Sequence, residues 1–249
     1  MRHRSISSNN ARLPQAGSII ASTCASPIDA LYLAAIFDPV FTASYPTTRL
    51  VEPISLFQAM LRPFLAPRQT PKPNAYLVDL ETLVAQHPSR AIVVFPECTP
   101  SNGRGILPMS PSLLSTPRST KVYPVNLRYT SSDITTPIPH AYFTFLWNLC
   151  SQPTHCIRIR VAEAVPPAAP TARTSSYNTN YLDTLDNGGS DADTLVGSEE
   201  LEPITKEEKA FLDKIGEALA RLGRIKRVGL GVKEKEDFVA AWTRSKRRR

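Results

Sequence analysis

The sequence predicts an α/β fold, in which helices flank a central mixed sheet, and two observations lead to this prediction. Short runs rich in valine and isoleucine alternate with apolar segments of helical spacing, a pattern typical of a sheet covered by helices. Hydrophobic residues make up 42% of the 249 residues, which is enough to build a sizeable core. We therefore divide the chain into a flexible N-terminus (1–16), an α/β domain (17–165), a disordered linker (166–204) and a helical C-terminal extension with a basic tail (205–249).

The strands are predicted from short, β-branched apolar runs. The clearest is AIVVF at 91–95, which is typical of a buried strand. Further strands are expected at 18–23, 40–44, 121–129 and 156–165. Pro124 falls inside one of them. Because proline cannot donate a hydrogen bond to a neighbouring strand, it predicts an edge strand or a bulge there.

The helices are predicted from apolar spacing and from capping residues. Ser26 or Asp29 caps the helix expected at 30–37, with Pro27 near its first position. Further helices are expected at 54–64, 77–84, 140–149, 205–222 and 233–244, and a capping box of Thr205 and Glu208 opens the fourth of these. Between the domain and the extension, residues 171–200 are rich in Ser, Thr, Asn, Asp and Gly, which predicts disorder.

The charge balance indicates which partners to expect. The formal net charge is +7 and the pI is near 9.4, which favours anionic partners such as phospholipid headgroups or phosphorylated cofactors. The basic tail suggests nucleic acid as a further possible class of partner. The chain has no nucleic-acid-binding motif and no interleaved aromatic and basic residues, so we expect no nucleic acid.

The cysteines and the hydropathy of the chain indicate its redox state and how it could contact a membrane. Its cysteines, Cys24, Cys98, Cys150 and Cys156, lack metal-ligand spacing, so they are interpreted as reduced thiols and no metal is implied. No apolar run reaches the roughly 18 uncharged residues that a spanning helix needs, and the N-terminus does not resemble a secretory signal. We expect a soluble chain or one that lies on a membrane surface. An upstream anchor missing from the sequence is the third reading.

The most informative segment joins FPECT at 95–99 to SNGR at 101–104. It resembles the third motif of the glycerol-phosphate and lysophosphatidate acyltransferase family, which reads Phe-Pro-Glu-Gly-Thr-Arg-Ser. Five of those seven positions match, and the motif directly follows a hydrophobic strand, as it does in the family. The surrounding sequence is more similar to the eukaryotic lysophosphatidate acyltransferase branch than to the bacterial enzymes.

Two further motifs of that family can be placed. The first, His followed by four residues and Asp, corresponds to 24–29, where Asp29 matches and Cys24 stands in the histidine position. The fourth, Val-x-Pro-Val, matches VYPV at 122–125. The second, Gly-x-x-Phe-x-x-Arg, has no convincing counterpart. The resemblance covers roughly residues 17–165 and leaves the C-terminal helices outside it.

The resemblance implies transfer of a fatty acyl group from acyl-CoA, a co-substrate and not a bound cofactor, to the hydroxyl group of lysophosphatidate or a related lysophospholipid. In the family the histidine is the general base and the aspartate orients it, so Cys24 and Asp29 are the candidate catalytic residues. The residues expected to shape and bind the acceptor-phosphate site are Glu97, Thr99, Ser101, Asn102, Gly103 and Arg104. Arg104 is the nearest guanidinium to replace the motif arginine, whose position Pro100 occupies.

Cys24 leaves three readings open. It acts as a base or nucleophile, which requires a lowered pKa and a nearby base. It leaves a slow enzyme that relies on positioning, or it marks a pseudoenzyme. No histidine is placed by sequence to replace the base, and His140 comes nearest. Cys98, in the position of the motif glycine, is interpreted as a packing residue and predicts that the backbone there does not have positive φ.

The sequence therefore predicts an acyltransferase of glycerolipid synthesis, bound peripherally to the cytosolic face of the endoplasmic reticulum membrane or a lipid droplet. The aromatic cluster at 142–147 is expected to be core or membrane-facing surface. The alternative, motivated by Cys24, is a catalytically silent lipid-binding or membrane-trafficking protein on the same fold.

Overall fold

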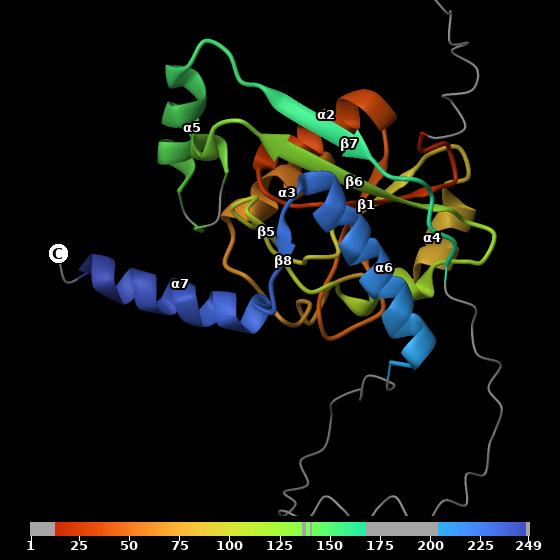
Figure 1. The fold of residues 1–249 in the computed structure, drawn as a ribbon. Helices are drawn as coiled ribbons and strands as arrows, with labels where there is room; N and C mark the ends of the chain where they lie inside the picture. The colour runs from red at the N-terminus through yellow and green to blue at the C-terminus, as the bar shows by residue number, and fades with distance from the viewer. Residues whose placement is uncertain (1–12, 136–137, 140, 168–203, 248–249) are drawn as a thin grey trace, which may run out of the picture.

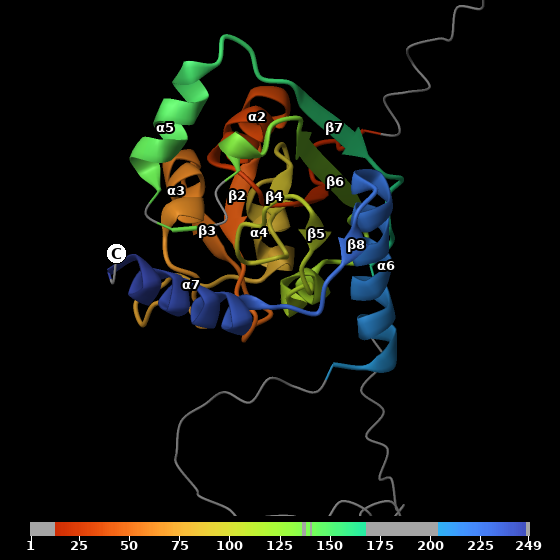
Figure 2. The ribbon, with the colours of Figure 1, turned by 60° about the vertical axis from the view of Figure 1, so that its left-hand side comes forward.

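The computed structural model describes residues 13–135, 138–139, 141–167 and 204–247. Most of the predicted flexible N-terminus and of the predicted disordered linker lies outside these residues. In the described part, helices cover both faces of a six-stranded sheet (Figure 1), and a short two-stranded pairing lies beside it (Figure 2). The predicted α/β architecture is confirmed.

The six-stranded sheet is mixed, as predicted, with the strand order β3-β2-β4-β1-β6-β7. The strands β2, β4, β1 and β6 run parallel, whereas the edge strands β3 and β7 are antiparallel to their neighbours. In sheet order the bounds are Glu52–Ile54, Val40–Ala43, Ile92–Val94, Ile19–Ser22, Val122–Tyr129 and Ile157–Val161. β1 and β4 are buried along their whole length, because helices cover both faces of the parallel centre.

Successive side chains of the central strands point to opposite faces and build two cores. On one face, Ile20 and Val93 pack with residues of α2 (Pro27–Phe37) and α3 (Leu56–Leu61). On the other face, Ile19 and Ile92 pack with α4 (Leu80–Gln86), the 3-10 turn η2 (Pro111–Ser115) and α6 (Lys206–Gly223).

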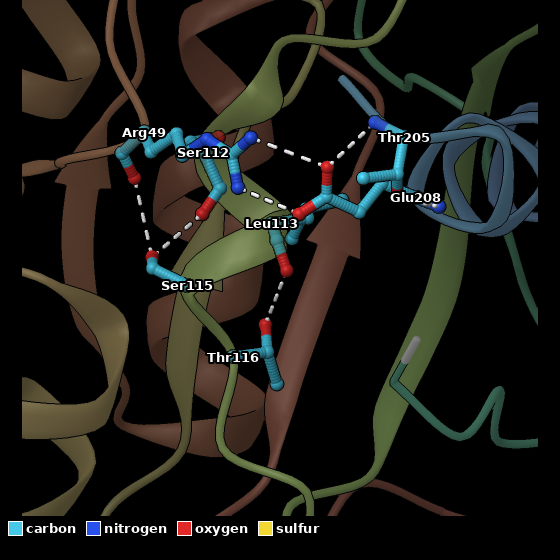
Figure 3. A network of polar contacts seen from close by, with 7 residues as sticks. All are labelled: Arg49, Ser112, Leu113, Ser115, Thr116, Thr205 and Glu208. Carbon is cyan, nitrogen blue, oxygen red and sulfur yellow. Dashed lines mark hydrogen bonds and ion pairs between the residues drawn. The ribbon is translucent and has the colours of Figure 1, made fainter. Parts of the chain in front are cut away.

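The C-terminal extension is built into this fold. α6 crosses one face of the sheet (Figure 1) and adds four side chains to its core: Phe211, Leu212, Ile215 and Leu219. A polar network holds the start of α6 (Figure 3), in which Glu208 accepts bonds from Thr205 N and, at 2.6 and 3.2 Å, from Arg49. Ser115 of η2 in turn donates to Arg49 O at 3.1 Å. The predicted capping box is confirmed and also ties α6 to the loop before β3.

Two further helices lie away from the sheet centre. α5 (Tyr142–Ser151) contains no fully buried residue. α7 (Val232–Arg247) follows β8 (Lys226–Arg227), which pairs in parallel with β5 (Gly105–Ile106) in the loop after the third motif. This pairing explains why the start of α7 lies close to that loop (Figure 2).

The prediction that Pro124 marks an edge strand is wrong, and the extra residue of a β-bulge lies in the chain facing β6 and not in β6 itself. β6 is paired on both sides, by β1 and by β7. From the Val122–Val165 bridge to the Val125–Val161 pair, the chain facing β6 takes four steps against three along β6. A strand that has one residue more than its partner over the same paired stretch contains a β-bulge. Ala162 N still donates to Pro124 O at 2.9 Å.

Several predicted helix boundaries also need correction. The helix expected at 54–64 begins only after Ser55, because residues 52–54 pair with β2 as an edge strand, and it ends as a 3-10 turn. The helix expected from residue 77 starts at Leu80, where Asp79 caps it by accepting from Thr82 N at 2.8 Å. The sequence periodicity was correct in both segments, but pairing and capping decide where each helix starts.

Candidate functional site

The candidate site lies at the carboxyl ends of β1 and β4, the two strands at the centre of the sheet. After β1 the chain passes through α2 to β2, on the β4 side, whereas after β4 it reaches β6 on the opposite side of β1. Loops that leave neighbouring parallel strands in opposite directions open a crevice between them, which is the usual place for a ligand in such sheets. The first motif follows β1 and the third follows β4, so the fold brings the two motifs together.

Asp29 is held rigidly in this crevice. Ser26 caps α2, and Asp29, at the third helical position, completes a capping box. Its carboxylate accepts bonds from Ala25 N at 2.7 Å and Ser26 N at 2.9 Å, and from the Tyr129 hydroxyl. Burial raises the pKa of Asp29 to about 6, and these donors partly offset that rise. The donors in these hydrogen bonds are backbone N–H groups and Tyr129, so Asp29 acts first as a structural acceptor.

Glu97 ties the two motif loops to each other. Its carboxylate, 1% exposed, accepts from Cys24 N at 3.4 Å and from Leu107 N at 3.0 Å. Burial raises the pKa of Glu97 to about 8; the negative charge of Asp29 raises it further, and the positive charge of Lys235 lowers it. A buried carboxyl group that serves two backbone donors shapes the site and is not placed to bind a phosphate directly.

Cys24 lines a small cavity of about 20 Å³ that Asp29, Arg62 and Cys98 also line, with room for roughly one water molecule. Burial, followed by the charges of Asp29 and Glu97, raises the pKa of the Cys24 thiol far above its ordinary value. The group is therefore a neutral thiol at physiological pH. A nucleophilic cysteine needs the opposite shift, so the structure disfavours the nucleophile reading.

The third-motif loop departs from expectation at Cys98. Its backbone has φ 59°, so the prediction that this position avoids positive φ is wrong. Cys98 N donates to Phe95 O at 3.1 Å and Thr99 N to Glu97 O at 2.7 Å. These bonds close a tight turn in which the cysteine adopts a left-handed backbone conformation that favours glycine.

Replacing Cys98 should expose the strain in this turn. We expect Cys98→Gly to be more stable than Cys98→Ala by about 1 kcal/mol, because only glycine adopts left-handed backbone without a steric cost. Both variants lose the sulfur atom, so their difference isolates the backbone. Urea unfolding of the two variants measures it, and an alanine variant equal to or more stable than the glycine variant would show that the turn is unstrained.

The remaining candidate substrate-binding residues take different places. Ser101 Oγ accepts from Gly103 N and Asn102 Oδ1 from Arg104 N, so both side chains shape turns. Ser101 N also donates to Cys24 O at 2.8 Å. Thr99 is buried, and its hydroxyl has no hydrogen-bond partner among the described residues. Arg104 is exposed at the rim of a groove.

Two larger pockets meet at Pro100. One, about 210 Å³ and called here the cationic pocket, is lined by Thr99, by one acidic residue, Glu52, and by three cationic residues: Arg62, Arg68 and Lys72. The other, about 460 Å³, lies between the third-motif loop and α7, and is mainly apolar, with Leu107, Leu230 and Phe238 among its lining residues. Pro100 lines both pockets and the small cavity at Cys24. A molecule with an anionic end and an apolar end therefore has a matching surface on each side of Pro100.

Sequence reasoning missed two cations of the site. Lys235, from α7, donates to Pro100 O and lies near enough to Glu97 for the charge of that carboxylate to raise its pKa, against the effect of burial. Arg62 packs over the Tyr45 ring, 4.8 Å from its centroid, and donates to Ser44 O at 3.2 Å. Lys235 lies beyond the family resemblance, and the segment before Arg62 lacks the Gly and Phe of the second motif, so no local signal marked either residue.

The histidines of the described part do not occupy the base position. His87 ends α4 and His155 contacts Leu149 O at 2.7 Å. His3 and His140 lie outside the described residues. Among the residues that the structure covers, no cluster of His, Cys, Asp and Glu is arranged to bind a metal ion, and no helix is long and apolar enough to cross a membrane.

A comparison with curated proteins gives a distant relative. The chain is 26% identical over 125 residues to a protein of Schizosaccharomyces pombe named "Putative lysophosphatidic acid:oleoyl-CoA acyltransferase". The match covers 50% of this chain and 42% of that protein, so it spans less than half of the relative. No protein-family model and no solved structure matches the chain. The relative supports an acyltransferase relationship.

Proposed function

We propose that the chain transfers a fatty acyl group from acyl-CoA to the hydroxyl group of lysophosphatidate or a related lysophospholipid in glycerolipid synthesis. The observation that carries this proposal is the meeting of an apolar groove and a cationic pocket at Pro100, beside Cys24, Asp29 and Glu97. The name of the distant relative describes the same reaction.

The two pockets suit the two ends of a lysophospholipid reaction. Arg62, Arg68 and Lys72 offer positive charge to the acceptor phosphate, and the unpartnered Thr99 hydroxyl beside them offers one more hydrogen bond. The apolar groove suits an acyl chain, because its lining loses contact with water when a chain enters. This assignment moves the phosphate site from Arg104 to the residues around Thr99.

We also propose that the protein works on a membrane surface, at the cytosolic face of the endoplasmic reticulum or a lipid droplet. α5 exposes 89% of Phe143 and 74% of Trp147, with Leu146 between them also exposed. Large apolar side chains that remain exposed together are typical of surfaces that contact a lipid or another protein. The acceptor would then enter the site from the membrane. The proposed reaction uses no bound metal or cofactor.

The test is acyl transfer from labelled oleoyl-CoA, with lysophosphatidate and monoacylglycerol compared as acceptors. We expect labelled phosphatidate to form, and we expect Arg68→Met with Lys72→Met to raise KM for lysophosphatidate several-fold, because each of these exposed cations would lose a charge-assisted contact with phosphate worth up to about 1 kcal/mol. The exposed Arg158 of β7 supplies the matched control, Arg158→Met, which should leave KM unchanged. Retained lysolipid binding without any transfer would favour the catalytically silent lipid-binding protein instead.

A further inference from the structure

We propose that Lys235, contributed by α7 of the C-terminal extension, is the general base that removes the proton from the acceptor hydroxyl. The inference rests on the proposed acyl transfer and answers a question that this function raises. The first motif holds Cys24 where the family has histidine. Neither histidine of the described residues reaches the site, which raises the question of which described group could accept the proton.

The placement of Lys235 is the main argument. β8 pairs with β5, and this pairing brings α7 against the third-motif loop, where Lys235 Nζ donates to Pro100 O. The side chain is partly buried and lines the apolar groove at the residue shared with the cationic pocket. An acceptor whose phosphate lies in the cationic pocket would have its hydroxyl close to this shared edge.

The surroundings of Lys235 also make its neutral amine form accessible near neutral pH. Burial lowers its pKa to about 8, while the negative charge of Glu97 works in the opposite direction. Glu234 and Arg104 line the same groove, and Asp29 and Arg62 lie around the neighbouring cavity. A base is most effective when its pKa lies near the working pH. A neutral amine can donate to Pro100 O and still accept a proton through its lone pair.

Lys235 alone can accept and return the proton that the reaction moves. As the acceptor oxygen forms a bond to the thioester carbonyl carbon, its proton passes to the neutral Nζ of Lys235. The tetrahedral adduct then collapses and the carbon–sulfur bond breaks. The resulting ammonium returns the proton to the departing CoA thiolate, so the enzyme ends in its starting state and no other reactant is needed.

The inference predicts what Lys235 variants do. We expect Lys235→Met and Lys235→Arg each to lower kcat for phosphatidate formation about a hundredfold or more, the usual size of a general-base contribution. Arginine keeps the charge but does not lose a proton at working pH. Lys233→Met, an exposed change on the same helix, should leave kcat unchanged. Circular dichroism of each variant checks that α7 is still folded.

Rescue by histidine tests the role most sharply. In the Lys235→Met background, Cys24→His should recover at least tenfold in kcat, and the rate should then rise near pH 6.5, the ordinary pKa of histidine, instead of near pH 8. A merely structural role of Lys235 would show neither recovery nor the moved pH profile, which matters because Glu97 also has a pKa of about 8.

The outcomes separate this inference from the proposed function. Transfer by the unaltered chain that persists in Lys235→Arg would overturn the base role and leave the acyltransferase standing. Loss of activity in Lys235→Met without rescue by Cys24→His would also overturn it. Absence of transfer in the unaltered chain would overturn the proposed function and the base role together.

Discussion

Replacing Asp29 with alanine is expected to lower the free energy of unfolding by about 3 kcal/mol or more. Three buried donors, Ala25 N, Ser26 N and the Tyr129 hydroxyl, share its carboxylate. Each donor left without a partner costs about 1–3 kcal/mol. Because a small domain has only about 5–15 kcal/mol of stability in total, the loss should be plain in urea unfolding followed by circular dichroism.

Tyr129→Phe is the matched control for this prediction. It removes one donor and leaves the carboxylate with its two backbone partners, so we expect a smaller loss. In the Asp29→Ala background the same change should cost little, because the hydroxyl has already lost its acceptor. Stability unchanged in Asp29→Ala would mean that water replaces the carboxylate, and that Asp29 is free of the structural role assigned to it.

Glu97 should make the protein more stable at pH 5 than at pH 8. The pKa of its folded form is about 8, against 4.5 for an ordinary glutamate, and Asp29 is shifted upward in the same way, to about 6. Between about pH 4.5 and 8 the folded chain therefore binds protons that the unfolded chain does not. Stability falls as pH rises through this window, by a difference on the order of 3 kcal/mol.

The Glu97→Gln variant isolates the contribution of this carboxyl group. Its amide does not titrate, so most of the difference between pH 5 and pH 8 should disappear, whatever the variant's stability at either pH. Glu81→Gln, an exposed change on α4, should keep the wild-type difference. Urea unfolding midpoints of the three proteins at both pH values give the comparison. An undiminished pH difference in Glu97→Gln would show that Glu97 is already ionised at pH 5.

The sequence predicted those features that depend on neighbouring residues. The buried strands at the sheet centre, the cap at Ser26 and the capping box at Thr205 each depend on residues within one turn or one strand, and all were confirmed. The third motif followed a strand as expected, which placed Glu97 and Asp29 in one crevice. Local chemistry was a sufficient guide in these places.

Features set by tertiary contacts could not be predicted in this way. The positive φ of Cys98 is imposed by a turn that its residue type disfavours, so reasoning from the side chain gave the wrong conformation. Lys235 reaches the site because β8 pairs with β5. Each of these strands is only two residues long, too short to predict from the sequence. Pro124 fits a doubly paired strand because the facing chain carries an extra residue.

The central claim is that this site couples thioester cleavage to acylation of a lysophospholipid, and CoA release tests it most directly. The unaltered chain would be mixed with oleoyl-CoA, with and without lysophosphatidate, and free CoA and phosphatidate would be measured together. If the proposed function is right, CoA release depends on lysophosphatidate, and the amount of free CoA equals the amount of phosphatidate formed. CoA release that ignores the acceptor, or no release while both ligands bind, would contradict it.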